Sequence, residues 1–316
     1  MGVDEERDGV ELTNLDQQLF DDAGVTKREF VDYLDRVSDR IVPALAGRPL
    51  SVIRARPGGD NFMQKNLPRH APDFIRTVTL WAETSKRDVT YAVCDSRKTL
   101  LWFANQRAVE FHPALATVDH PDRVTHLVID LDPPSGSDFS LVVKAAVAVR
   151  AVLDQNGLSG AVKTSGSKGI HVFVPINESV TPADAAAATR ALAAQTAALD
   201  PSVATTAFLK EDRAGKVFID STRVGGSTVV AAYSPRVRPG VPVSFPVGWD
   251  ELGSVSPSDF TIRTAAALLG ERDPWSEQMP RAQSLPDELV AAGQEIPVAR
   301  VEAMHEGRRR KRGAKK

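Results

Sequence analysis

The chain has 316 residues, of which 42% are hydrophobic and 25% charged, so it can bury a sizeable core and is long enough for two packed subdomains or one large α/β unit. No apolar run reaches the roughly 18 residues of a membrane-spanning helix, and the acidic start MGVDEERDG has no secretory signal character. The single cysteine, Cys94, excludes an internal disulfide. These features predict a soluble protein of the cytoplasm with no membrane partner.

Charge is distributed unevenly along the sequence. The last ten residues, GRRRKRGAKK, carry seven positive charges, and subtracting these from the net charge of −2 leaves −9 on the rest. A basic tail after an acidic body is typical of a polyanion partner such as nucleic acid, or of a flexible solubilising end. Both interpretations stay open on this feature alone.

Residues 1–120 are predicted to form an N-terminal α/β module. A helix is expected from Thr26 to Gly47, because Thr26 and Glu29 form a capping box and apolar residues follow at helical spacing. The strand-like and helical segments that follow are strands at 50–56, 75–83 and 88–94, a helix at 96–106 and a strand at 109–113.

Residues 121–245 are predicted to form a catalytic, palm-like sheet. The segments, in order, are a strand at 124–134, a helix at 139–157, two strands within 161–176, a helix from Thr181 to Pro201, and hairpin-like strands at 216–222 and 226–238. This order predicts a split βαβ sheet with helices on one face. Residues 246–300 are expected to be a closing helical segment, and residues 301–316 a basic flexible tail.

Two aspartates interrupt the most apolar strand, HLVIDLDPP, at residues 126–134. Because side chains alternate along a strand, Asp130 and Asp132 share one open face, and the aliphatic residues between them point to the core. A divalent cation would relieve the repulsion of the carboxylates, and hard oxygen ligands suit Mg²⁺ or Mn²⁺. The segment predicts a metal site; a surface turn in which DPP ends the strand is the alternative.

A glycine-flanked turn, TSGSKGIHV, lies between the two strands that follow. Gly166 and Gly169 would let backbone N–H groups approach an anion, Ser165 can donate a hydrogen bond, and Lys168 supplies charge. His171 falls on the face opposite the aliphatic residues of its strand. The turn predicts a phosphate-binding loop, although its spacing is not that of a Walker A motif and an ordinary hairpin turn is the alternative.

A third carboxylate, Asp220, interrupts the apolar strand KVFIDS. Together with Asp130 and Asp132 it would complete a site able to hold two metal ions, as used for displacement at phosphorus. Arg236 and Arg238 in YSPRVR alternate onto one face of a predicted strand and could clamp a triphosphate. The alternative for this pair is a solvated strand edge.

The motifs DLDP, SGSKGIHV, VFID and YSPRVR, in that order, resemble the polymerase domain of the bacterial end-joining ligases of the ligase D type, a branch of the archaeo-eukaryotic primase superfamily. The resemblance extends from LTNLDQQLF to GERDPW. It implies an α/β (α+β) fold, with an archaeo-eukaryotic primase-like catalytic core whose split βαβ (RRM-like) sheet packs against the N-terminal α/β module. Because no ligase or nuclease region follows, the chain resembles a stand-alone polymerase of that family.

The resemblance also implies roles for individual residues. Asp130, Asp132 and Asp220 would be the ligands of two Mn²⁺ or Mg²⁺ ions. The phosphates of the incoming nucleoside triphosphate would contact His112, Ser165, Lys168, His171 and Arg236. Asn14 and Lys27 would hold the 5′-phosphate of a DNA gap, and Phe62 and Met63 would wedge against the template. A preference for ribonucleotides and for Mn²⁺ is implied as well.

Three departures from the family pattern stand out. Gln17 replaces the usual lysine three residues after the asparagine, which predicts weaker recognition of the 5′-phosphate. Arg223 and Val224 stand where the family has Gln-Asn, and the following lysine is also missing. The stretch between His112 and Asp130 is short for ligase-linked members, so substrate preference is expected to differ.

The net acidic body must bind a DNA backbone through local basic patches. Lys27, Arg54, Arg56 and Lys65 are the candidates, and the run 308–312 would add non-specific attraction. DNA, nucleoside triphosphates and a separately encoded ligase and end-binding protein are the expected partners, which would place the enzyme at the nucleoid.

The favoured function is a template-dependent primase-polymerase, a nucleotidyltransferase that adds nucleotides to primer 3′-ends in gap filling or end-joining repair by two-metal transfer. A metal-dependent nuclease or phosphohydrolase needs similar carboxylates but would use water as the nucleophile. A non-catalytic protein that binds DNA ends is the third hypothesis, and the presence of all three carboxylates argues against it.

Overall fold

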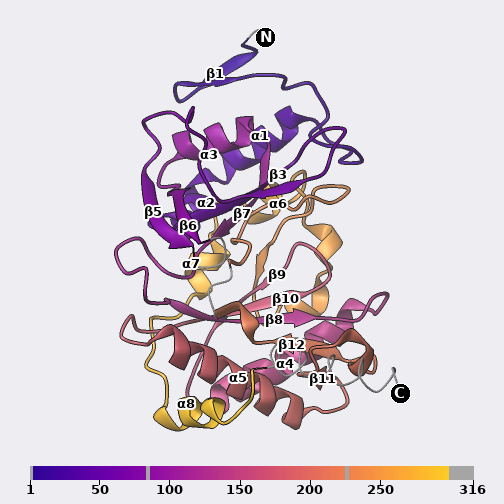
Figure 1. The fold of residues 1–316 in the computed structure, drawn as a ribbon. Helices are drawn as coiled ribbons and strands as arrows, with labels where there is room; N and C mark the ends of the chain where they lie inside the picture. Colours follow the sequence, from indigo (N-terminus) through magenta and orange to yellow (C-terminus); the bar gives the residue numbers. More distant parts are fainter. Residues whose placement is uncertain (1–2, 83–85, 225–227, 299–316) are drawn as a thin grey trace, which may run out of the picture. The chain divides into compact units, whose positions relative to one another are not determined.

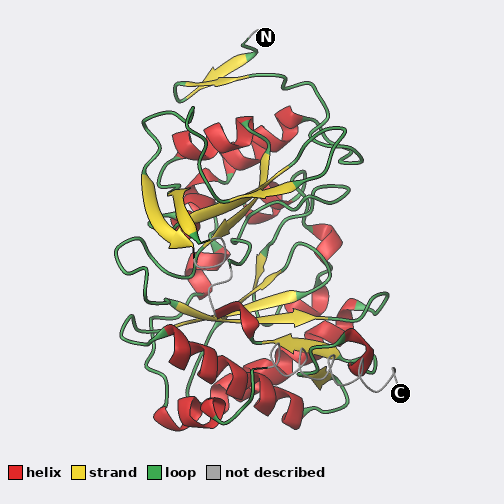
Figure 2. Ribbon diagram, viewed as in Figure 1, coloured by secondary structure: helices red, strands yellow, loops and turns green. Residues whose placement is uncertain are grey.

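The computed structural model describes residues 3–82, 86–224 and 228–298. Contacts divide the chain into two compact units, each built from separate stretches of sequence. The first comprises residues 1–121, 163–167 and 226–278, and the second residues 122–162, 168–225 and 279–316. Both units contain helices and strands, which confirms the predicted α/β class (Figures 1 and 2). The predicted boundaries at 121, 246 and 301 cut the sequence into consecutive blocks, whereas these units interleave along it.

The first unit is built on an antiparallel sheet with the strand order β4-β3-β6-β5, and β7 also pairs with β3. Its strands are β1 (Glu5–Arg7), β2 (Val10–Leu12), β3 (Leu50–Arg54), β4 (Phe62–Gln64), β5 (Thr77–Ala82), β6 (Arg87–Ala92), β7 (Ala108–Pro113) and β13 (Pro246–Val247). Its helices are α1 (Lys27–Arg36), α2 (Ser38–Leu45), α3 (Arg97–Asn105), α6 (Ala265–Leu269) and α7 (Pro274–Gln278). The strands predicted at 50–56, 75–83, 88–94 and 109–113 and the helix at 96–106 are therefore present.

The single helix predicted from Thr26 to Gly47 is two helices. Its start is as expected, because Thr26 is the N-cap of α1 and forms the capping box with Glu29. The helix ends at Arg36, and α2 begins at Ser38 after Val37, whose backbone leaves helical geometry. Pro43 lies inside α2 and does not cause this break, because its ring crowds the carbonyl of Asp39, four residues earlier, which already belongs to α2.

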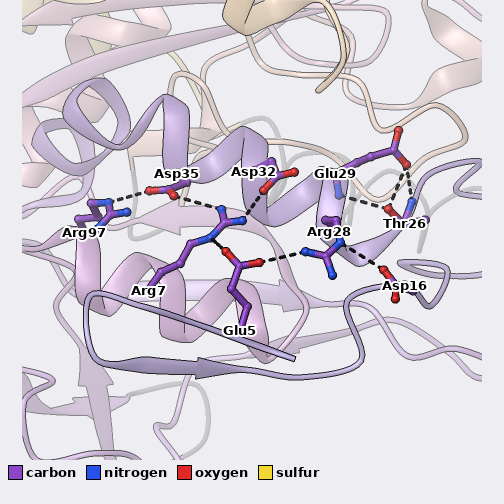
Figure 3. Close-up of polar contacts among 9 residues, drawn as sticks. All are labelled: Glu5, Arg7, Asp16, Thr26, Arg28, Glu29, Asp32, Asp35 and Arg97. Atoms are coloured by element: carbon purple, nitrogen blue, oxygen red, sulfur yellow. Dashed lines mark hydrogen bonds and ion pairs between the residues drawn. The ribbon is translucent and has the colours of Figure 1, made fainter. Parts of the chain in front are cut away.

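A network of ion pairs ties the β1–β2 hairpin to helices α1 and α3 (Figure 3). The Arg7 guanidinium contacts Glu5, Asp32 and Asp35 at 2.6, 2.7 and 3.1 Å. Arg97 of α3 donates to the other oxygen of Asp35 at 2.6 Å. Because Arg7 is partly buried and meets three carboxylates, the network is stronger than isolated surface pairs.

The second unit contains the predicted split βαβ sheet. Its strands are β8 (His126–Asp132), β9 (Ala161–Thr164, of which the last two residues belong to the first unit), β10 (Ile170–Pro175), β11 (Ala204–Thr205) and β12 (Val217–Asp220), and its helices are α4 (Phe139–Gln155), α5 (Pro182–Leu199) and α8 (Asp287–Gln294). The strand order runs β11-β12-β8-β10-β9, and β10 and β12 both pair antiparallel with β8. The chain order β8-α4-β9-β10-α5-β12 therefore places the central strand β8 between the two strands that flank the site.

Helices α4 and α5 pack on this sheet and on each other (Figure 2). Asp138 is the N-cap of α4. Thr181, where the second helix was predicted to begin, is the N-cap of α5, and Pro182 occupies its first turn. Within the described ranges, no helix has both the length and the apolar character to cross a bilayer.

The strand predicted at 226–238 is wrong. Among residues 228–238 the structure has no strand, and the segment makes isolated bridges, Thr228 with Ala114 and Pro235 with Val243. Scattered backbone hydrogen bonds, such as that of the Arg236 N–H with Pro242 O, and side-chain acceptors take the place of a regular ladder here. The Ser234 hydroxyl accepts the N–H of Phe111, and the Glu110 carboxylate accepts the N–H of Val237. Residues 225–227 and the basic tail predicted at 301–316 lie outside the described residues.

Candidate active site

Three strands of the second unit bring charged side chains to one point. Antiparallel register sets Asp130 of β8 directly opposite Asp220 of β12 and His171 of β10, while Asp132 lies opposite Phe218. Side chains of directly paired residues lie on the same face of a sheet. The three predicted carboxylates and His171 are therefore neighbours, although Asp220 is separated from the first two by almost 90 positions in the sequence.

The face that carries these carboxylates is more buried than the sequence indicated. Asp130, Asp220 and His171 are each buried, with 5–6% of their surfaces exposed, and only Asp132 is partly open. Val128, two residues before Asp130 on the same face, is fully buried. The predicted open face is thus wrong for most of β8, and Asp132 marks where the strand reaches solvent.

Arg223 supplies the positive charge beside the buried carboxylates. Its Nη2 lies 2.8 Å from Asp130 Oδ2 and 3.3 Å from Asp220 Oδ2, and its Nε donates to Asp130 Oδ2 at 3.0 Å. The other oxygen of Asp220 accepts from the Thr222 N–H and hydroxyl at 2.8 and 2.6 Å. From the sequence, Arg223 was predicted only to be a departure from the family pattern. The signal for its role was its position three residues after Asp220, at the end of an apolar strand that bears an aspartate.

The two aspartates of β8 differ in their electrostatic surroundings. Burial opposes ionisation of Asp130, but the charges and hydrogen bonds of His171 and Arg223 outweigh it and lower the pKa of its carboxyl. For Asp132, burial and the negative charge of Asp130 raise the pKa, and Arg223 only partly offsets them. Asp132 is therefore the carboxylate with uncompensated charge.

The carboxylate oxygens of the three aspartates suit a hard cation, but two of the aspartates are ion-paired with Arg223. Three carboxylates on adjacent strands offer the oxygen ligands that Mg²⁺ and Mn²⁺ prefer. Across residues 3–82, 86–224 and 228–298, however, no three His, Cys, Asp or Glu side chains stand in an arrangement ready to hold a metal ion. The guanidinium of Arg223 lies between the oxygens of Asp130 and Asp220 that such an ion would need.

A second group of charged residues lies in the first unit, around Glu110 of β7. Glu110 is 4% exposed. Its Oε2 is 2.9 Å from His112 Nε2 and 3.0 Å from Arg236 Nε, and its Oε1 accepts the N–H of Val237 at 2.9 Å. Burial alone would raise the pKa of this carboxyl, but His112, Arg236 and the Val237 N–H lower it to about 2. Glu110 therefore stays ionised.

Glu110 was not among the site residues predicted from the sequence. The signal was the same as for the aspartates, because Glu110 and His112 alternate on one face of the apolar strand VEFHP. Predicted triphosphate contacts His112 and Arg236 are brought together by this carboxylate, not by a shared strand.

The glycine-rich turn joins this group through Arg236. The Arg236 Nη1 donates to Ser165 O at 2.6 Å, and the Ser167 N–H donates to the Ser165 hydroxyl at 3.3 Å. Gly166 has a φ of +69°, and a Cβ there would lie 2.6 Å from Arg236 Cγ and 2.9 Å from Ser244 N. Glycine is required both by this conformation and by the closeness of Arg236. Lys168, which begins the second unit's part of the turn, is exposed, as is Arg238, whereas Gly169 is buried.

Lys27, a predicted contact for the 5′-phosphate, is buried. Its Nζ donates to Thr13 O and Asn105 Oδ1, both at 2.6 Å. Burial, and then the charge of Arg107, lower its pKa to about 8. The exposed amide of Gln17 lies nearby, because it donates to Asn14 Oδ1 at 3.3 Å and accepts from Arg107 Nη2 at 2.7 Å. Lys27 is thus part of the scaffold under Asn14 and Gln17.

The predicted template contacts cluster on β3 and β4. Phe62 pairs in register with Arg54, and the guanidinium carbons of Arg54 and Arg56 lie 5.6 and 4.9 Å from the centre of its ring. These are cation–π distances. Met63, which points to the opposite face of β4, and Lys65 are exposed. An aromatic ring clasped by two arginines can contact both the backbone and the bases of a nucleic acid.

Known proteins resemble the chain in sequence and fold. The family model described as LigD, primase-polymerase domain, matches residues 26–275. The Bifunctional non-homologous end joining protein LigD of Bacillus subtilis (strain 168) is 35% identical over 260 residues, 81% of this chain and 41% of that protein. The Multifunctional non-homologous end joining DNA repair protein LigD of Mycobacterium tuberculosis (strain H37Rv) is 35% identical over 254 residues, 77% of this chain and 33% of that protein.

A solved structure shares the fold. The Polymerase Domain from Mycobacterium tuberculosis Ligase D in complex with DNA superposes with a TM-score of 0.77 at 31% identity, covering 87% of this chain and all of that one. This confirms the predicted primase-like fold. The chain spans about one third to two fifths of the length of the curated relatives that it matches.

Proposed function

Because the chain belongs to the LigD primase-polymerase domain family, we propose that it is a template-dependent nucleotidyltransferase that extends primer 3′-ends during gap filling and DNA end joining. The observation that carries this proposal is the register of β8 and β12, which sets Asp130 opposite Asp220 and two residues from Asp132. Carboxylates gathered on adjacent strands are the basis of nucleotidyl transfer assisted by metal ions.

Asp130, Asp132 and Asp220 are the residues that would hold two divalent ions, Mn²⁺ or Mg²⁺. Bound there, the ions would lower the pKa of the primer 3′-hydroxyl and neutralise charge on the leaving pyrophosphate. Arg223 has to give up its contacts with Asp130 and Asp220 when these oxygens are needed. Asp132, the carboxylate with the least compensation, is the oxygen donor that gains most from added positive charge.

The chain's other charged residues would bind the nucleoside triphosphate. His112, Ser165 and Arg236 are joined through Glu110 and the Ser165 carbonyl, and they present a donor cluster suited to phosphate oxygens. The remaining predicted contacts are Lys168, Gly169, His171 and Arg238. Lys168 and Arg238 are exposed and supply charge, and the Gly169 backbone can approach an anion closely.

DNA would be held by the first unit. Asn14, supported by the buried Lys27, would receive the 5′-phosphate of a gap. Arg54, Arg56 and Lys65 would contact the backbone, while Phe62 and Met63 would lie against the template. The mycobacterial polymerase domain was solved in complex with DNA, which supports DNA as the partner of this chain.

We further propose a preference for ribonucleotides and for Mn²⁺, which rests on the family alone. Filling a gap leaves a nick, so the reaction calls for a DNA ligase acting on the same ends, together with a protein that binds them. These partners follow from the chemistry of end joining in the named relatives.

A non-catalytic protein that binds DNA ends is the second candidate, and Arg223 is the observation that favours it. A carboxylate pair neutralised by a resident guanidinium needs no metal ion. We prefer the polymerase, because a protein that only binds DNA ends has no need for the uncompensated charge of Asp132 or for the cluster of His112 and Arg236 around Glu110.

A gap-filling assay tests the proposal. Duplexes with a one-nucleotide gap, with and without the 5′-phosphate, are incubated with ribo- or deoxynucleotides in Mn²⁺ or Mg²⁺. We expect template-matched addition by the wild type and by Asp154→Asn, an exposed carboxylate of the same unit, and none by Asp130→Asn. Hydrolysis of the DNA without nucleotide addition would establish the nuclease hypothesis, and DNA binding without either reaction would establish the end binder.

A further inference from the structure

We propose that Glu110 is a positioning residue that holds His112 and Arg236 in the orientation in which they bind the triphosphate. This inference rests on the proposed function and goes beyond it, because it assigns a role to a negatively charged residue beneath an anion site. A carboxylate repels phosphate, so its place there needs a reason. The contacts of Glu110 with its neighbours supply that reason.

Glu110 leaves His112 only one arrangement. An ionised carboxylate can only accept hydrogen bonds, so the 2.9 Å contact of Glu110 Oε2 with His112 Nε2 requires a proton on Nε2. This fixes the rotation of the ring and leaves Nδ1 as the nitrogen that could meet a ligand, to which it donates as the imidazolium. The same relation between a carboxylate and a histidine orients functional imidazoles in many enzymes.

Glu110 also holds Arg236. Its Oε2 lies 3.0 Å from Arg236 Nε, but the N–H does not point at that oxygen, so this contact is an ion pair. Among the described residues, Arg236 Nε finds no hydrogen-bond partner. The guanidinium continues through Nη1 to Ser165 O, which links Glu110 to the glycine-rich turn.

The segment that carries Arg236 belongs to no strand, and side-chain contacts add to the backbone hydrogen bonds that hold it, such as that of the Arg236 N–H with Pro242 O at 2.8 Å. Glu110 Oε1 accepts the N–H of Val237, the residue after Arg236. Two nearby residues, Tyr233 and Val241, have positive φ values of 66° and 47°. Such conformations are costly for residues other than glycine, and they persist where surrounding contacts fix them and the geometry serves a site.

An amide cannot replace this carboxylate. Glutamine at position 110 would have one acceptor oxygen and an NH₂ group, yet two donors, His112 Nε2 and the Val237 N–H, meet the two oxygens of the present side chain, and the Arg236 guanidinium pairs with its charge. At least one of them would face another donor. The variant has almost the same volume, so it separates loss of charge from loss of packing.

The test compares Glu110→Gln with Asp35→Asn. Asp35 is a matched control, because it is a partly buried carboxylate of the same unit, bound by two arginines, but it lies in the network of the β1–β2 hairpin (Figure 3). We expect Glu110→Gln to raise the KM for the nucleoside triphosphate by about tenfold or more, with a smaller change in kcat and an unchanged KM for gapped DNA. Asp35→Asn should lower the midpoint of unfolding and leave the KM for nucleotide unchanged.

A double-mutant cycle distinguishes positioning from a general effect. If Glu110 acts through its partners, Glu110→Gln should change the KM much less in an Arg236→Ala background than in the wild type. Additive effects, or a single variant with the KM of the wild type, would overturn the inference. If Glu110→Gln does not fold, Glu110→Asp, which keeps the charge but withdraws it by one methylene, takes its place, and the same two outcomes decide. Failure of the proposed function gives a different result: the wild-type protein itself would add no nucleotide. Failure of the inference would leave the wild type active and would show only in the KM values of the variants.

Discussion

The Arg223 guanidinium binds Asp130 through both Nη2 and Nε, at 2.8 and 3.0 Å from the same carboxylate oxygen, and Nη2 also lies 3.3 Å from Asp220. It lies where positive charge is most favourable, against two carboxylates from adjacent strands. Any other cation that uses these oxygens must compete with it.

Competition predicts that Arg223→Gln binds Mn²⁺ more tightly than the wild type in the absence of nucleotide. Removal of the guanidinium exposes the charge of Asp130 and Asp220, so the affinity should rise by about tenfold or more. Titration followed by the electron paramagnetic resonance signal of free Mn²⁺ measures this without any activity. Arg223→Lys, which keeps the charge, should resemble the wild type; equal affinities in all three proteins would contradict the prediction.

Asp130 and Asp132 should respond oppositely in stability. Asp130→Asn removes a buried partner of Arg223 and His171, so we expect the free energy of unfolding to fall by about 2 kcal/mol. Asp132→Asn removes a carboxylate whose pKa is raised by its neighbours, so the variant should be as stable as the wild type or more stable. Urea unfolding at neutral pH measures both. A larger loss of unfolding free energy for Asp132→Asn than for Asp130→Asn would contradict the prediction that Asp130 is the better compensated of the two charges.

Burial of Lys27 predicts a stability that rises in alkaline solution. Its pKa is about 8 in the folded chain and near 10.5 when unfolded. Between these values the unfolded state binds a proton that the folded state does not, so the free energy of unfolding increases with pH, by on the order of 3 kcal/mol in total. Below pH 8 the lysine is charged in both states and the cost of burying it is complete.

Lys27→Met keeps the length of the side chain and removes its charge. Subtracting the pH profile of this variant from that of the wild type isolates the lysine from tyrosines and other lysines that titrate in the same range. Parallel profiles between pH 8 and 10.5 would show that Lys27 titrates normally. The variant should also lower affinity for gapped DNA bearing a 5′-phosphate more than for the dephosphorylated duplex, if Lys27 contacts that phosphate.

Gly166→Ala should weaken nucleotide binding. The added methyl would meet Arg236 Cγ and the backbone of Ser244, so Arg236 has to move away from Ser165 or the turn has to open. Gly47→Ala is the matched control, because Gly47 has nearly the same φ, +67°, with open space around its Cβ position. Both variants carry the conformational cost of about 1 kcal/mol, but only Gly166→Ala should raise the KM for the triphosphate. Equal KM values in the two variants would show that the glycine-rich turn does not contribute to nucleotide binding.

The carboxylates could be predicted because their signal is local. Asp130 and Asp220 each interrupt an apolar strand, and alternation along a strand is read from neighbouring residues. The segment that carries Arg236 could not be predicted in the same way. Its alternating apolar residues favour a strand, but its actual partners, Phe111 and Glu110, are more than 120 residues away in the sequence. The break at Val37 has no local signal of this kind, because Pro43, the proline of this segment, lies inside α2.

The interleaving of the two units has a consequence for synthesis of the chain. Tyr33 donates to the carbonyl of Tyr233, and Glu110 receives the N–H of Val237, so the first module of the sequence depends on residues 226–278 for its completion. On the ribosome, residues 1–121 emerge long before those partners and must wait while the split βαβ sheet is translated. The sheet of the second unit can close its hydrogen bonds during that interval, because β8, β10 and β12 all precede residue 226. Chains that end at residue 225, once clear of the ribosome, would therefore carry a protease-resistant β8-β10-β12 sheet, still without α8 of the second unit, and a susceptible first unit.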